Sequence, residues 1–241
     1  MNTTQTLEQL HQLKLYGMET CYKMQLDLPV HQQLEAHELM AQATQSEMIQ
    51  RSNEKATYYL RLARLRLAAT PEQIQCSASR NLTKQQLAEL LEGNYIKQAE
   101  PVLITGATGC GKSYLACALG HQACLQGYKT AYFNMNRFIE KITLAKLDGS
   151  YIKILNHYER VHLIILDDFG LQPMDQNVKL ALLQILEDRY AKKSIIVTSQ
   201  LPVSKWHEYI NEPTLADAIL DRMTAKAHRI ELKGESMRKK K

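Results

Sequence analysis

The sequence lacks the features that mark several large classes of protein. No apolar run is long enough to cross a bilayer, and the first residues carry no signal-peptide pattern. Only five cysteines are present, an odd number without a C-x-x-C pair, which argues against a disulfide framework and against a zinc site. We therefore expect a cytoplasmic protein that does not bind membranes and that holds reduced, mostly buried thiols.

The positive charge of the chain is concentrated at one end. The net charge is +5, and residues 222–241 alone contain eight lysines or arginines against two glutamates. The run Arg238-Lys239-Lys240-Lys241 closes this segment. Such a basic tail is either a solvated chain end or a contact to nucleic acid, and charge alone does not separate the two alternatives.

Apolar periodicity divides the chain into a helical part and a mixed part. Residues 1–68 show helical spacing and no strand pattern, which predicts a small all-helical domain with helices near 7–16, 34–40 and 58–67. Residues 69–82 contain Pro, Ser and Asn and read as a connector. Five apolar runs then alternate with helical patterns, so we expect an α/β domain over 69–241 with a parallel sheet. The predicted strands are 101–105, 129–135, 161–166, 194–199 and 227–232.

Residues 106–113 read G-x-x-x-x-G-K-S, and they fall between a predicted strand and a predicted helix. This is the context of a P-loop, in which backbone N–H groups surround the phosphates of a nucleoside triphosphate. Lys112 should reach the β- and γ-phosphates, and Ser113 should hold Mg²⁺. The residues predicted to contact the nucleotide are Gly106, Ala107, Thr108, Gly109, Cys110, Gly111, Lys112, Ser113 and Tyr114.

A pair of carboxylates follows the apolar run 161–166. Because ligands bind at the carboxyl ends of strands in open α/β sheets, Asp167 and Asp168 should lie beside the phosphates. Asp167 is the expected Mg²⁺ partner, and Asp168 is placed to orient or deprotonate an attacking water. The alternative is that one aspartate caps the next helix, a role that fits Asp175 better.

A polar end also closes the predicted strand 194–199. If this strand lies between the P-loop strand and the acid-tipped strand, Ser199 and Gln200 come close to the γ-phosphate and can position water. The alternative is an ordinary polar strand end that meets solvent.

Several longer strings resemble one family. They are Leu-Asp-Asp-Phe-Gly, Val-Thr-Ser-Gln-Leu-Pro, Leu-Ala-Asp-Ala-Ile-Leu-Asp-Arg and His-Arg-Ile-Glu-Leu-Lys-Gly-Glu-Ser-Met-Arg. With the P-loop, they closely resemble the IstB family of AAA+ helper ATPases from bacterial insertion sequences, which is akin to the DnaC-type helicase loaders. The resemblance implies a five-stranded AAA+ fold, ATP and Mg²⁺ as cofactors, and a homo-oligomer with shared ATP sites. It also implies double-stranded DNA and a cognate transposase as partners, with the helical domain 1–68 contacting one or both.

The resemblance assigns roles to individual residues as well. Arg222 matches the arginine that completes the ATP site of a neighbouring subunit, and Arg238 matches a second sensor arginine. The resemblance to loaders also makes Lys141, Lys146 and Lys153 candidate DNA contacts. The basic cluster Arg61, Arg64 and Arg66 is a second candidate set, and for both sets the alternative is a solvated face. The rival functions are a replicative helicase loader and a nucleotide-gated architectural protein of DNA.

Overall fold

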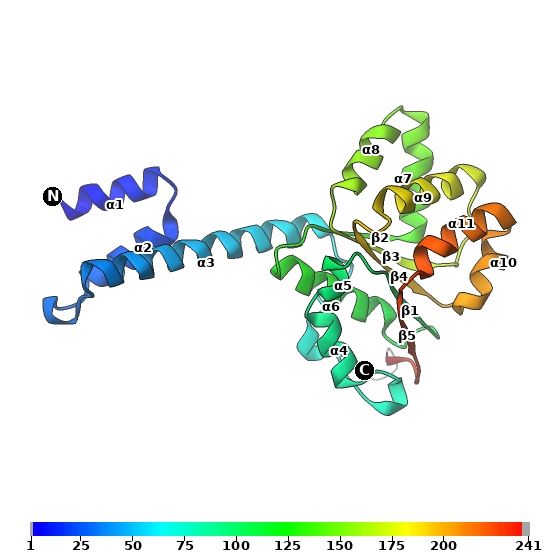
Figure 1. Cartoon of the computed structure of the whole chain (residues 1–241), viewed down its shortest axis with the longest axis horizontal. Helices are drawn as coiled ribbons and strands as arrows, with labels where there is room; N and C mark the ends of the chain where they lie inside the picture. Colours follow the sequence, from blue (N-terminus) through cyan, green and yellow to red (C-terminus); the bar gives the residue numbers. More distant parts are fainter. Residues whose placement is uncertain (1, 238–241) are drawn as a thin grey trace. The chain divides into compact units, whose positions relative to one another are not determined.

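The computed structural model describes residues 2–237, and the chain divides into two compact units, Met1–Tyr58 and Tyr59–Lys241 (Figure 1). Arg238, predicted as a sensor, and the basic tail 239–241 lie outside the described residues. Within residues 2–237, no helix is both long enough and apolar enough to cross a membrane.

The first unit is helical, as expected, but its helices begin and end at other residues than the periodicity suggests. It contains α1 (Thr3–Gln12), α2 (Tyr16–Leu26), the short 3-10 helix η1 (Val30–Gln32) and most of α3 (Ala36–Ala63). The helix α3 joins the segments predicted near 34–40 and 58–67. Neither Gly nor Pro interrupts residues 41–57, so the intervening polar residues continue the helix. The helix also ends earlier than expected, because Arg64 adopts a left-handed backbone with φ of +50°.

One carboxylate connects two helices of this unit. Helix α2 begins without a side-chain cap, and Glu47 of α3 supplies one, since its Oε2 accepts from Gly17 N at 2.8 Å and Met18 N at 3.3 Å. Arg51 donates to the other oxygen at 2.7 Å. A side chain at Gly17 would meet Ser46 O at 2.5 Å, so glycine permits this close approach.

We expect Glu47→Ala to lower the free energy of unfolding of this unit by about 1–3 kcal/mol, because first-turn N–H groups lose a charged acceptor. The Arg51 hydrogen bond, helped by Gly17 and Met18, lowers the pKa of Glu47 below its usual 4.5. The contribution is therefore present above pH 4.5 and is lost as the pH falls through the lowered pKa. Amide hydrogen exchange of α2 at neutral and acidic pH measures this pH-dependent stabilisation by Glu47. Glu54→Ala, at an exposed site of α3, is the control, and equal protection of α2 in both variants would contradict the prediction.

The second unit contains the predicted five-stranded parallel sheet. Its strands are β1 (Val102–Gly106), β2 (Thr130–Asn134), β3 (Leu163–Phe169), β4 (Ser194–Ser199) and β5 (His228–Leu232). Their order is β2-β3-β4-β1-β5, with all pairs parallel. The position of β4 between the P-loop strand and the acid-tipped strand, expected from the sequence, is confirmed.

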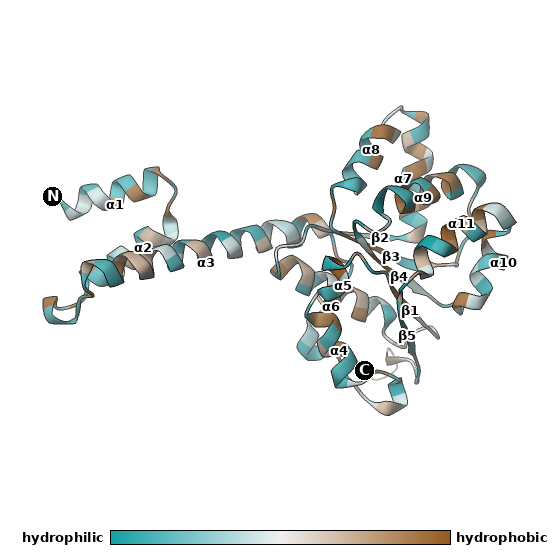
Figure 2. Ribbon diagram, viewed as in Figure 1, coloured by the Kyte–Doolittle hydropathy of each residue, from teal (hydrophilic) through white to brown (hydrophobic). Residues whose placement is uncertain are grey.

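Helices cover both faces of the sheet (Figure 1). One face packs against α4 (Lys84–Leu91), α5 (Asn94–Lys97) and α6 (Lys112–Leu125), and the short 3-10 helices η2 (Pro71–Gln73) and η3 (Ala78–Arg80) belong to the connector on this side. The other face packs against α7 (Met135–Leu147), α8 (Tyr151–Glu159), α9 (Gln176–Arg189), α10 (Trp206–Ile210), which η4 (Val203–Lys205) precedes, and α11 (Pro213–Thr224). Hydrophobic and hydrophilic residues are interspersed along these helices, as in amphipathic helices (Figure 2).

The strands are buried on both sides, and alternate residues enter different cores. In β3, Leu163 and Ile165 join the core beneath α6, whereas Ile164 and Leu166 join the core beneath α7 and α9. At the start of α9, Asp175 accepts from Val178 N at 2.8 Å, so its predicted capping role is confirmed. All five strands end at the same edge, which brings the polar ends of β1, β2, β3 and β4 together.

Candidate functional site

The P-loop connects β1 to α6 and is held open by left-handed glycines, with φ of +83° at Gly109 and +93° at Gly111. Lys112 is 5% exposed, and its ammonium donates to Gly106 O and Ala107 O, both at 2.8 Å. These carbonyls carry no net charge, so the positive charge of Lys112 is available to a phosphate group.

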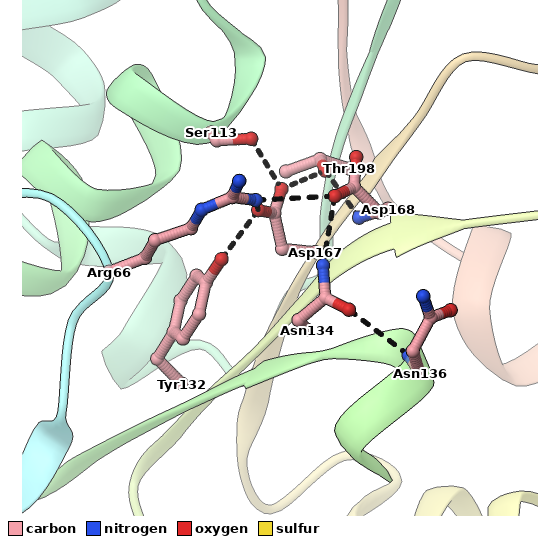
Figure 3. A network of polar contacts seen from close by, with 8 residues as sticks. All are labelled: Arg66, Ser113, Tyr132, Asn134, Asn136, Asp167, Asp168 and Thr198. Carbon is pink, nitrogen blue, oxygen red and sulfur yellow. Dashed lines mark hydrogen bonds and ion pairs between the residues drawn. The ribbon is translucent and has the colours of Figure 1, made fainter. Parts of the chain in front are cut away.

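The carboxylate of Asp167 is the centre of a polar network (Figure 3). Asp167 is fully buried; its Oδ1 accepts from Ser113 Oγ at 2.8 Å and from Thr198 Oγ1 at 2.5 Å. Its Oδ2 accepts from Tyr132 OH at 2.5 Å. A hydroxyl and a carboxylate in contact beside the P-loop are oxygen ligands of the kind that Mg²⁺ takes in nucleotide sites, so Ser113 and Asp167 fit this ion.

Asp168 lies where the pairing of β3 with β4 becomes irregular, between Leu166 and Phe169, and its φ is +65°. Its Oδ2 accepts from Asn134 Nδ2 at 2.9 Å and lies 3.4 Å from Nη1 of Arg66. Burial, and next the charge of Asp167, raises the pKa of Asp168, while Arg66, Asn134 and Lys112 oppose the rise. A raised pKa makes this carboxylate a better proton acceptor.

A cavity of about 410 Å³ opens beside the P-loop. Thr108 Oγ1 donates to Gln200 Oε1 at 2.7 Å, which connects the loop to the end of β4. The phosphate side of the cavity is lined by Thr108, Gly109, Gly111, Lys112, Ser113, Asp168 and Gln200. The opposite side is lined by Leu67, Gln73, Ile74, Gln75, Arg80, Tyr114, Leu115 and Met237. The structure thus brings most of the predicted nucleotide residues around one cavity.

The side chains of two predicted site residues, Ser199 and Cys110, are buried and do not line this cavity. Ser199 is fully buried, and its hydroxyl donates to Phe169 O and accepts from Leu201 N. The Ser199 hydroxyl thus makes its hydrogen bonds with backbone groups, which disfavours the expected contact with the attacking water. Gln200 remains the candidate for positioning that water. The thiol of Cys110 is also buried, so only the backbone of this residue is placed to meet a phosphate.

A second set of residues around the site was not predicted from the sequence; it lies in the connector and at the ends of β2 and β4. Tyr114 OH donates to Gln73 of the connector, and Arg80 donates to Cys110 O at 2.9 Å. Thr198 and Asn134 hold the two aspartates, and Asn134 Oδ1 also accepts from Asn136 N at the start of α7. No motif marks Gln73 or Arg80, whereas Thr198 and Asn134 could have been found as polar ends of the predicted strands.

Arg222 does not reach the P-loop of its own chain. It donates to Glu187 Oε1 at 3.0 Å and to Ala218 O at 2.8 Å, and its side chain is 26% exposed. It lines a separate cavity together with Pro101 and Ile195, which lie at the starts of β1 and β4. A role for Arg222 in hydrolysis therefore requires a second subunit.

The predicted DNA contacts only partly come together. Arg64, Arg66 and Lys141 line a depression of about 730 Å³ with Arg137, which the sequence analysis missed; we call this depression the basic groove. Its other lining residues include Tyr132, Phe133, Asn134, Glu140 and Asp148. Of the remaining candidates, Lys146 donates to Asn177 at 3.0 Å and Lys153 is exposed on α8. Neither these two nor Arg61 is among the described residues that line the groove.

Comparisons with known proteins show the family and the fold of the chain. Residues 8–241 match the family model described as IstB-like ATP binding protein. Two putative insertion sequence ATP-binding proteins of Sinorhizobium fredii are 41% and 43% identical over 234 residues; each match covers 97% of this chain and 96% and 94% of the relatives. The insertion sequence IS21 putative ATP-binding protein of Pseudomonas aeruginosa is 29% identical, with 96% of this chain and 87% of that protein covered.

Solved structures show the fold. The DnaC helicase loader matches with a TM-score of 0.56 at 17% identity, covering 68% of this chain and 97% of that one. The replication initiator DnaA bound to AMPPCP and single-stranded DNA matches with a TM-score of 0.58 at 20% identity, covering 71% and 52%. The sheet order and these neighbours identify an AAA+ P-loop fold, and the family match over nearly the whole length shows that the chain belongs to the IstB-like ATP binding proteins.

Proposed function

We propose that this protein is an ATP- and Mg²⁺-dependent ATPase that binds double-stranded DNA and assists the transposition of an insertion sequence. It would oligomerise on target DNA in the cytoplasm and recruit or activate the cognate transposase. The observation that carries the proposal is the convergence of Lys112, Ser113 and Asp168 on one cavity, with the buried Asp167 in hydrogen-bond contact with Ser113. These groups supply what phosphoryl transfer to water needs.

Different residues would bind the phosphates, hold the metal ion and activate the attacking water. Lys112 and the loop N–H groups bind the β- and γ-phosphates. Ser113 and Asp167 would hold Mg²⁺, which would supply positive charge beside the phosphate oxygens. Asp168 takes the proton of the attacking water, and Gln200 orients that water. Arg222 of a neighbouring subunit stabilises the charge of the transition state, so the oligomer contains shared sites.

The relatives favour transposition over helicase loading. Proteins at 41% and 43% identity over 97% of the chain are named for insertion sequences, whereas the likeness to the DnaC loader, at 17% identity, reflects the fold. Capture of purified transposase, but not of replicative helicase, by the full chain with ATP and duplex DNA is the expected result. Capture of helicase alone would favour the loader.

The basic groove supports the DNA part of the proposal. Arg64, Arg66, Arg137 and Lys141 outnumber the two acidic residues of its lining, Glu140 and Asp148. Burial, and then the nearby positive charge of Arg64, lowers the pKa of Lys141, and the second cause places two cationic side chains close together in the groove. Contacts from such residues to phosphates position a protein on DNA without reading its sequence.

We expect the double variant Arg137→Gln, Lys141→Gln to bind unrelated duplexes with equally reduced affinity. Each phosphate contact that is lost should reduce the slope of log affinity against log salt by about one unit. Fluorescence anisotropy at several salt concentrations, with Mg²⁺ and a non-hydrolysable ATP analogue, measures the slope. Lys153→Gln on α8 is the comparison. If this single change reduces the affinity and the salt slope as much as the double variant does, the result would favour the face of α8 over the groove as the DNA-binding surface.

A further inference from the structure

Residues 64–67 separate the nucleotide cavity from the basic groove. Leu67 lines the nucleotide cavity, while Arg64 and Arg66 line the groove. The backbone of this segment is held from both sides, because Leu65 packs against the core beneath α6 and Ala69 is buried against Cys117 and Ala118 of that helix. The side chain of Arg66 therefore starts from a fixed backbone in the wall between the two spaces.

From this position Arg66 reaches the catalytic acids (Figure 3). Its Nη1 lies 3.4 Å from Asp168 Oδ2 and 3.8 Å from Asp167 Oδ2. Asp168 itself lines the nucleotide cavity, and Asn134, its other partner, lines the groove. One guanidinium thus faces the carboxylates required for hydrolysis and also the space proposed for DNA phosphates.

The ion pair between Arg66 and Asp168 is long, and its arginine is accessible from the groove. Charge-assisted bonds of arginine to carboxylate are strongest near 2.7–2.9 Å, roughly 0.5 Å shorter than the contact seen here. The side chain of Arg66 is 48% exposed, whereas Asp168 is 19% exposed and Asp167 is fully buried, so solvent reaches the guanidinium side of the pair. A phosphate in the groove, which meets Arg64 and Lys141 as well, can therefore compete for Arg66.

We propose that Arg66 is a positioning residue that pairs with Asp168 in the resting chain and with a DNA phosphate in the DNA-bound chain. The exchange rests on the proposed DNA-binding ATPase function and couples its two parts. In the resting pair, Asp168 Oδ2 accepts from Asn134 and faces Arg66, so it is not free to take a proton from water. Transfer of Arg66 to DNA removes one of these partners and restores negative charge beside the Mg²⁺ site.

The test uses the reciprocity of coupling, because two ligands that favour the same state strengthen each other by one common factor. In the parent chain, saturating Mg²⁺ and AMP-PNP should tighten duplex binding about fivefold or more, and duplex should raise the ATPase rate. In Arg66→Gln, the tightening should fall to about onefold and the basal ATPase rate should rise, because Asp168 is already released. Arg66→Lys, which keeps the charge, should recover part of the tightening.

Two controls separate coupling from groove charge and from surface charge. Arg64→Gln should weaken duplex binding but keep the parental tightening by AMP-PNP, since Arg64 lines only the groove. Arg160→Gln, an exposed arginine at the end of α8, should match the parent in every measurement. Parental tightening and parental stimulation in Arg66→Gln would overturn the inference and leave the proposed function intact. A parent chain that neither binds duplex nor hydrolyses ATP would overturn both.

Discussion

An Asp168→Asn chain should hydrolyse ATP about 10²-fold more slowly than the parent or worse, while it binds ATP with nearly parental affinity. Asparagine keeps the size of the side chain and an oxygen that can accept from Asn134, but it cannot take a proton from water. The binding step depends on Lys112, Ser113 and Asp167, which the change leaves in place. Phosphate release gives the rate, and titration with a fluorescent ATP analogue gives the affinity.

The control for this change is Asp175→Asn, the same substitution at the start of α9. Asparagine caps helices as well as aspartate, so this variant should turn over at the parental rate. Because the Asp168→Asn chain binds ATP without using it, its assembly on DNA should persist after the parental assembly has dissociated. Parental turnover in Asp168→Asn would remove Asp168 from the role of proton acceptor.

Replacement of Arg222 by alanine should reduce turnover further, by about 10³-fold, the lower end of what an arginine finger contributes. ATP binding should be preserved, because Arg222 lies away from the P-loop of its own chain and pairs with Glu187. The sharper test is a mixture with Lys112→Ala, which lacks the phosphate-binding charge. Sites that combine Lys112 from one variant with Arg222 from the other should restore part of the activity.

Lys192→Ala, an exposed residue after α9, serves as the control and should behave as the parent when it is mixed with Lys112→Ala. Co-assembly of the two inactive chains is checked by sedimentation with AMP-PNP. If they co-assemble and no mixing ratio restores turnover, the ATP site is not shared in the way proposed.

Patterns within short segments predicted most of the fold. Each strand of the sheet is an apolar run. The sequence offered the run 194–199 as a strand between the acid-tipped strand and the P-loop strand, and β4 lies there. Alternation along β4 also explains why the prediction for Ser199 was too broad: Thr198 faces Asp167, so the next side chain points to the opposite face.

Contacts between distant segments could not be predicted in this way. Arg66 is separated from the acids by about a hundred residues and reads, in sequence, as one member of a basic cluster with Arg61 and Arg64. Only the turn after α3, which begins at Arg64, directs it to Asp168. The connector near Gln73 likewise has the composition of a loop, and its place in the wall of the nucleotide cavity depends on packing against α6.

The most direct test of the account is the steady-state rate of ATP hydrolysis by the full chain, measured with and without Mg²⁺ and with and without duplex DNA. The account predicts turnover that requires Mg²⁺, that rises when duplex is added and that falls about 10²-fold or more in Asp168→Asn. A parent chain whose rate with Mg²⁺ and duplex equals that of Asp168→Asn would contradict it.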